Sequence, residues 1–430
     1  MKKSKFVQST IILMIGGLIT KILGMLIKIV MTRFLGAEGT GLYMLISPTF
    51  MLLIALSQLG FPIAISKLVA EDTKNNKNLV FSIIPIALFI NILLILLLFT
   101  FGKIVSDVFL HEPRVYLAIL CMGFVLPFIS ISAILRGYFF GKEKMFPHVL
   151  SNVLEDVIRL GILIIGIPYF LTQGIEVTIA FLILSNIVSE LTSIIVFFFF
   201  LPKNFHLEKK DFRPDRKNMS DILRISLPTT GSRFIGNIGY FLEPIILTST
   251  LLAVGYSNSF IIKEYGILSG FVLPLLLLPS FFTSAISQAL IPVVSRSYSH
   301  RDYGYTKKKI FQAIFFSLLI GIPATILFEC FPEFFLKFIY NTSEGVLYLR
   351  VLAPICLFHY IQAPLTSALQ AMGKAGTAMN GTILGVVTRT ILLFGCSMMK
   401  IGLWGLVIAT SANIVFVTLH QAKHVKRFLH

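Results

Sequence analysis

Long apolar runs separated by short polar stretches recur from one end of the chain to the other. Each run is close to the ~20 residues that a helix needs to cross the hydrocarbon of a bilayer. Because hydrocarbon offers no partner to an open backbone group, we predict that these runs are α-helices. The predicted fold is an all-α integral membrane protein with about twelve spans, at residues 6–30, 43–66, 79–102, 115–138, 149–171, 177–201, 221–252, 267–294, 309–329, 346–371, 376–399 and 401–422.

A polar stretch at residues 202–220 lies close to the middle of the chain and leaves six predicted spans on either side. We therefore predict an N-terminal six-helix lobe at 1–201, a basic cytoplasmic linker at 202–220 and a C-terminal six-helix lobe at 221–430. A short repeat supports two related halves, since "LRGYFFGK" at 135–142 and "LQAMGK" at 369–374 each precede a span with an internal arginine. Transporters built from two such lobes bind substrate near the bilayer midplane, so a central cavity is expected.

Composition and charge support the same fold. Of the residues, 56% are hydrophobic and only 13% are charged, whereas soluble domains carry about 25% charge. The net charge of +17 comes from basic residues in alternate loops, which is the pattern of the positive-inside rule. We expect a multi-pass protein of the cell membrane with both termini in the cytoplasm, in contact with membrane lipids and not with nucleic acid.

The first predicted span contains two lysines, Lys21 and Lys28. A lysine at membrane depth costs about 2.5–3.5 kcal/mol on insertion scales and is usually functional. Helical spacing places both on one face with Gly17 and Gly24, which favours a hydrated cavity that receives an anion. The alternative is that the lysines snorkel to the membrane surface along their aliphatic stems.

Further candidates for a cationic cavity lie in the second half of the chain. Arg233 stands in "PTTGSRFIGNIGYFLEP" at 228–244, a span interrupted by glycine and proline, and such broken spans often form substrate sites. We expect Arg233 and Lys21 to face one cavity, with Arg389 of the eleventh span as a further candidate.

Acidic residues in two spans form a separate class, for which we expect a gate or an ion pair. Glu155 and Asp156 lie four and three residues before Arg159, so neutralisation within one helix is plausible. A structural ion pair and a proton-relay or gating role both stay open. Glu243, which follows Arg233, is assigned to the same class.

Residues for catalysis or for metal and cofactor binding are not evident in the sequence. It contains no D-x-D, H-E-x-x-H or G-x-S-x-G motif and no phosphate-binding glycine loop. Its cysteines have no C-x-x-C spacing, and we expect them, like His359, to serve core packing. The chain is predicted not to be an enzyme and to need no cofactor.

Several segments resemble a known family. The stretch 20–72, with "RFLGAEGTGLY" and "GFPIAISKLVAE", and the stretches 135–159 and 284–297 are similar to the stage V sporulation protein B family of polysaccharide biosynthesis flippases. The resemblance implies the superfamily of polysaccharide exporters, multidrug and toxin extrusion transporters and the lipid II flippase. It further implies transport of undecaprenyl-pyrophosphate-linked saccharides such as the peptidoglycan precursor lipid II, with a role in spore cortex formation.

Site residues carry over from that superfamily only in part. "KILG" at 21–24 resembles the "RVLG" of the lipid II flippase's first span, where the arginine is one of its essential cavity cations. A second flippase cation aligns with Ile27, next to Lys28, and another falls near the apolar Ile267, a loss for which Arg233 would compensate.

We therefore expect a flippase whose hydrated cationic cavity holds the headgroup while the prenyl tail stays in lipid. One alternative is a cation-coupled multidrug exporter of the same fold, although cationic drugs favour an acidic cavity. A membrane glycosyltransferase would need an acidic catalytic pair and large outer loops, which are missing. A non-transporting scaffold that binds cell-wall synthesis proteins is the remaining alternative.

Overall fold

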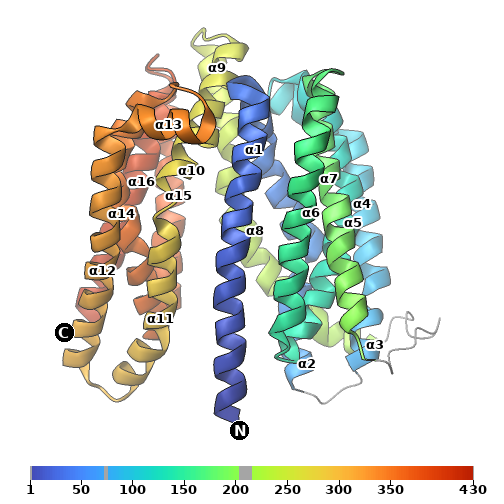
Figure 1. Cartoon of the computed structure of the whole chain (residues 1–430), viewed down its shortest axis with the longest axis vertical. Helices are drawn as coiled ribbons and strands as arrows, with labels where there is room; N and C mark the ends of the chain where they lie inside the picture. The colour runs from blue at the N-terminus through green and yellow to red at the C-terminus, as the bar shows by residue number, and fades with distance from the viewer. Residues whose placement is uncertain (1, 72–75, 203–215, 430) are drawn as a thin grey trace. The chain divides into compact units, whose positions relative to one another are not determined.

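The computed structural model describes residues 2–71, 76–202 and 216–429, and all regular secondary structure in these ranges is helical (Figure 1). The chain forms two compact units, Met1–Phe241 and Leu242–His430. This confirms the all-α prediction. The unit boundary falls inside one helix, and each unit has its own core.

In the described residues of the first unit there are seven α-helices and the beginning of an eighth. They are α1 (Lys2–Gln58), α2 (Phe61–Ala70), α3 (Asn76–Phe81), α4 (Ile84–Ile104), α5 (Tyr116–Gly141), α6 (Met145–Leu171), α7 (Ile175–Phe200) and the start of α8 (Arg216–Ala253), with short π and 3₁₀ turns at Val105–Phe109 and Pro113–Val115. The helix α1 joins two predicted spans but is broken at Gly36, whose φ of 64° and ψ of −169° are not helical. Glycine adopts such a conformation without a steric penalty, so the break divides α1 where two spans were predicted.

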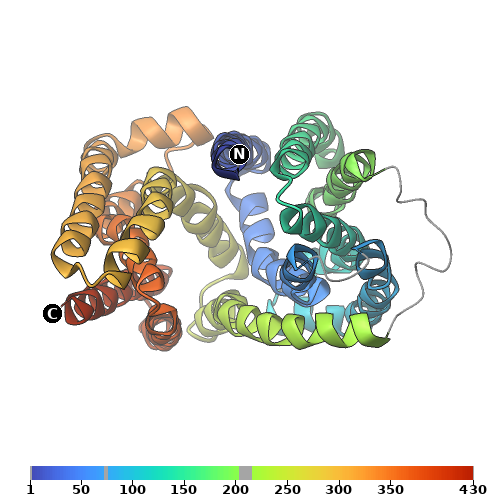
Figure 2. The same cartoon turned by 90° about the horizontal axis from the view of Figure 1, so that it is seen from below.

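The helix α5 is central to the packing of this unit. It lies against α1, α2, α4 and α7, and α6 runs beside α1 and α7 (Figures 1 and 2). Gly137 allows the close contact with α2, because a Cβ there would lie 2.7 Å from the carbonyl oxygen of Pro62. Small residues at a helix interface permit this approach of two backbones inside a membrane.

The second unit contains the end of α8 and the remaining helices. These are α9 (Asn258–Gly266), a π-helical turn (Ile267–Val272), α10 (Leu273–Leu276), α11 (Ser280–Ser299), α12 (Tyr303–Cys330), α13 (Pro332–Tyr340), α14 (Val346–Ala371), α15 (Ala375–Ser397) and α16 (Trp404–Phe428). The helix α14 packs against α11, α12 and α16, and α15 packs along α16. The predicted span 267–294 is therefore interrupted at residues 277–279, between α10 and α11.

Within the described ranges, nine helical segments are long and apolar enough to cross a membrane. One of them, Ile15–Ala70, covers residues 15–30 of the first predicted span and the whole of the second, on either side of Gly36. The helix α6 is outside this set and carries three charged residues, and the apolar part of α8, Asn237–Ala253, is shorter. With these additions each of the predicted spans falls largely on helix, although turns at 59–60, 82–83 and 277–279 interrupt three of them.

The outer surface carries large apolar side chains, as contact with lipid requires. Phe199, Ile165 and Phe311 are 83%, 79% and 72% exposed. A soluble protein rarely exposes so many large apolar side chains. The chain is thus an integral membrane protein.

The start of α8 packs with the first unit. Ile222 is completely buried in the same core cluster as Phe61, Phe139 and Phe197. The predicted linker at 202–220 lies largely outside the described residues. The division into functional lobes at 1–201 and 221–430 stays a prediction.

Candidate functional site

Lys21 and Lys28 lie on one face of α1, as their spacing predicts. The Lys21 side chain is exposed and that of Lys28 is half-buried. A Cβ added at Gly17 or Gly24, on the same face, would meet no atom within 4 Å. Among the described residues, neither lysine has a carboxylate within 4 Å. This face of α1 is therefore open, positively charged and without an internal counter-ion in the described part of the chain.

Arg389 has a different environment. Its Nη2 lies 2.6 Å from Oε2 of Glu243, and both side chains are nearly buried. The same nitrogen is 3.4 Å from the hydroxyl of Thr410, and the hydroxyl of Tyr265 donates to Oε1 of Glu243 at 3.3 Å. The pair thus connects α8, α9, α15 and α16 inside the second unit. The charge of Arg389 is matched within the protein.

A second group of charges lies inside the first unit. Nη2 of Arg136, on α5, is 3.6 Å from Oε2 of Glu155 on α6. Ser132, one turn before Arg136, donates a short hydrogen bond to the carboxylate of Glu190 on α7. Glu155 therefore pairs with an arginine of a neighbouring helix. Spacing along α6 does not predict this partner.

The other predicted residues of this group are placed as follows. Asp156 and Arg159 lie beside Glu155 on α6, close enough for their charges to act on it. Arg233 belongs to α8, but its side chain lies outside the described residues. In the part of the chain that the structure describes, no three His, Cys, Asp or Glu side chains are grouped as metal ligands would be.

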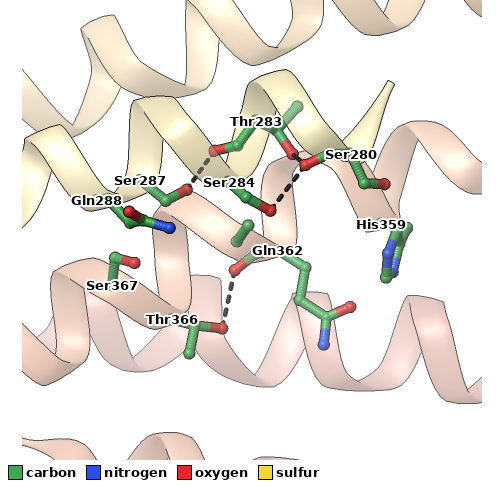
Figure 3. A pocket seen from close by; sticks show the side chains of 10 residues that line it. Ser280, Thr283, Ser284, Ser287, Gln288, His359, Gln362, Thr366 and Ser367 are labelled. Carbon is green, nitrogen blue, oxygen red and sulfur yellow. Dashed lines mark hydrogen bonds between the residues drawn. The ribbon is translucent and has the colours of Figure 1, made fainter. Parts of the chain in front are cut away.

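A polar cavity of about 390 Å³ lies between α11 and α14 in the second unit (Figure 3). The first helix contributes serine, threonine and glutamine side chains, and the second adds histidine, glutamine, threonine and serine. The residues that line it are Ser280, Thr283, Ser284, Ser287, Gln288, His359, Gln362, Ala363, Thr366 and Ser367. His359, expected in the core, stands at the wall of this cavity.

The sequence contains a signal for this cavity in its uncharged polar residues, which a prediction based on charged residues does not include. Polar residues at 280, 283, 284, 287 and 288 repeat with helical spacing on α11. Positions 359, 362, 363, 366 and 367 repeat in the same way on α14, with one alanine among them. Polar stripes at a 3.6-residue period inside apolar spans indicate helix faces turned away from lipid. That the two stripes face one another is visible only in the folded unit.

Comparisons with known proteins decide the family. The family model of polysaccharide biosynthesis proteins matches residues 6–298, more than half of the chain. The chain belongs to the polysaccharide biosynthesis protein family. This membership confirms the resemblance found in the sequence.

Individual relatives of this polysaccharide biosynthesis protein support the assignment. Stage V sporulation protein B of Bacillus subtilis (strain 168) is 35% identical over 440 residues, covering 100% of this chain and 85% of the relative. Lipid II flippase MurJ of the same organism is 21% identical over 435 residues, covering 90% and 77%. Such relatives place the chain among membrane flippases and exporters.

The fold of this family member is shared with a solved transporter. An inward-facing multidrug resistance MATE family transporter of the MOP superfamily superimposes with a TM-score of 0.77 over 95% of both chains, at 17% identity. A second family model, MatE, matches residues 266–394, which include α11 and α14. At this identity the likeness establishes the fold alone.

Proposed function

We propose that the chain is a flippase that moves undecaprenyl-pyrophosphate-linked saccharides, such as the peptidoglycan precursor lipid II, across the membrane by alternating access. A pyrophosphate with its sugars cannot cross ~30 Å of hydrocarbon unaided. Family membership and the relatives named stage V sporulation protein B and lipid II flippase support this class of substrate. A role in making the spore cortex, together with cell-wall synthesis proteins as partners, belongs to the same proposal.

The proposal depends on a contrast between cationic side chains: two arginines have carboxylate partners, whereas the lysines of α1 have none among the described residues. Arg389 and Arg136 have carboxylate partners, Glu243 and Glu155. Lys21 is exposed on a membrane-spanning helix without such a partner among the described residues. Since an unmatched cation at membrane depth is costly, its presence fits a site that an anionic group occupies during transport.

Proteoliposomes that contain fluorescent lipid II test the proposal, with a membrane-impermeant quencher to report the lipid in the outer leaflet. Wild type is compared with Lys21→Ala, Lys21→Arg and Arg233→Ala. The control is Lys103→Ala, which removes an exposed lysine from the last turn of α4. We expect wild type and Lys103→Ala to flip lipid II. Lys21→Ala should lower the flipping rate tenfold or more, and Lys21→Arg should restore much of that rate because the charge is kept.

The same vesicles distinguish the alternatives. Failure of folded wild-type protein to move lipid II or a shorter polyprenyl-pyrophosphate sugar would contradict the proposal. Ion-driven export of a cationic dye by that protein would instead identify a multidrug exporter. Absence of every transport activity would leave the scaffold role.

A further inference from the structure

The cavity between α11 and α14 is polar but carries no fixed charge. All of its lining residues except Ala363 have polar side chains, and none is Asp, Glu, Lys or Arg. Its volume of about 390 Å³ is within the ~300–1,000 Å³ usual for small-molecule sites. A site for phosphate would need cations or converging N–H donors, and a site for a metal or organic cation would need carboxylates. The lining therefore favours a neutral polar ligand.

Four hydroxyl groups of the cavity, those of Thr283, Ser284, Ser287 and Thr366, are arranged as hydrogen-bond acceptors. Ser284 donates to the carbonyl oxygen of Ser280 at 2.7 Å, and Ser287 donates to that of Thr283 at 2.6 Å (Figure 3). Thr283 likewise donates to the carbonyl oxygen of Ser280 at 3.2 Å. A hydroxyl that donates to its own helix keeps its lone pairs available. The wall of α11 thus offers several oxygen acceptors to a ligand rich in O–H and N–H groups.

The wall of α14 is held in place from behind by Gln421 of α16. Gln421 is completely buried, and its Oε1 accepts a hydrogen bond from the hydroxyl of Thr366 at 2.9 Å. The carbonyl oxygen of Gln362 is a second acceptor for the same hydroxyl, also at 2.9 Å. The single proton of the Thr366 hydroxyl goes to one or the other of these two acceptors inside the protein, so its lone pairs remain available. The Gln362 side chain at the same wall adds an amide that can both donate and accept.

We propose that this cavity binds the uncharged sugar portion of the transported lipid, through its hydroxyl and amide groups. The inference rests on the proposed function and assigns the saccharide to a set of residues different from the lysines assigned to the pyrophosphate. A prenyl tail does not fit this cavity, because hydrocarbon would leave the remaining lone pairs of these hydroxyls and the Gln362 amide without hydrogen-bond partners. A neutral saccharide replaces the water that these groups would otherwise bind.

The test separates the sugar from the rest of the lipid. Binding of fluorescent lipid II, of an undecaprenyl-pyrophosphate disaccharide without the peptide of lipid II, and of undecaprenyl pyrophosphate is titrated on purified full-length protein in nanodiscs; the last two lipids differ only in the sugar. The cavity variants are Gln362→Leu, Thr366→Val and Ser284→Ala, of which Ser284→Ala alters an exposed side chain and disturbs the packing least. The matched controls are Gln370→Leu, also on α14 but outside the cavity, and Thr388→Val on α15, whose hydroxyl bonds its own helix.

We expect each cavity variant to weaken the binding of lipid II and of the disaccharide lipid about three- to tenfold, as the loss of one hydrogen bond does, with undecaprenyl pyrophosphate unaffected. Lys21→Ala should weaken the binding of all three lipids, and the controls should match wild type. Equal losses for all three lipids in the cavity variants, or no loss for the disaccharide lipid, would overturn the inference while leaving the proposed function standing. Wild-type protein that binds none of the three lipids would overturn both.

Discussion

Arg389 and Glu243 form an ion pair of 2.6 Å within the second unit, and their side chains are only 12% and 10% exposed. The pair connects the end of α8 to α15, and Tyr265 and Thr410 each add a hydrogen bond to it. A buried pair of this kind stabilises little as a whole, but the loss of one partner leaves an unmatched charge. We therefore assign the pair a structural role between these helices.

Removal of either partner should destabilise the second unit. We expect Arg389→Ala and Glu243→Ala each to cost about 3–5 kcal/mol, because each leaves one buried charge without a counter-ion. The double variant Arg389→Met/Glu243→Leu should be closer to wild type than either single variant. Thermal unfolding in detergent, followed by loss of the monodisperse peak, measures all three. Additive losses in the double variant would show that the two residues act independently.

Lys28 provides a test between substrate binding and snorkelling. If it serves the anion site of α1 with Lys21, Lys28→Ala should lower lipid II flipping about tenfold, while Lys28→Arg keeps much of it. The reason is that a positive charge half-buried on the same face contributes directly to holding a pyrophosphate. Flipping rates in proteoliposomes, at equal amounts of reconstituted protein, provide the measurement. Unchanged flipping by Lys28→Ala would support the snorkelling alternative.

Gly137 should tolerate no side chain. We expect Gly137→Ala to destabilise the first unit by about 1–3 kcal/mol, since the new Cβ would lie 2.7 Å from the carbonyl oxygen of Pro62 and force α5 away from α2. Gly161→Ala on α6 is the matched control, because a Cβ there meets no atom within 4 Å. Unfolding temperatures of the two variants in the same detergent are compared with wild type. Equal stability of both variants would mean that α2 adjusts its position freely.

The positions of the spans were predictable because each depends on a local property, the length of an apolar run. The break at Gly36 falls between two apolar runs, whereas the interruption at residues 277–279 falls within one. Residues 267–294 were predicted as one span because hydropathy does not report where a helix is interrupted. The helix α6 was also correctly expected to be helical although its charges lower its hydropathy.

The sequence by itself determined that this protein is a helical membrane protein of its family, and that Lys21 and Lys28 share a face. Those properties follow from run length, composition and the 3.6-residue period of a single helix. Only the tertiary structure decided that Glu155 pairs with Arg136, that Arg389 pairs with Glu243, and that the polar faces of α11 and α14 line one cavity. The partners come from different helices, so helix packing, and not spacing along the chain, selects them.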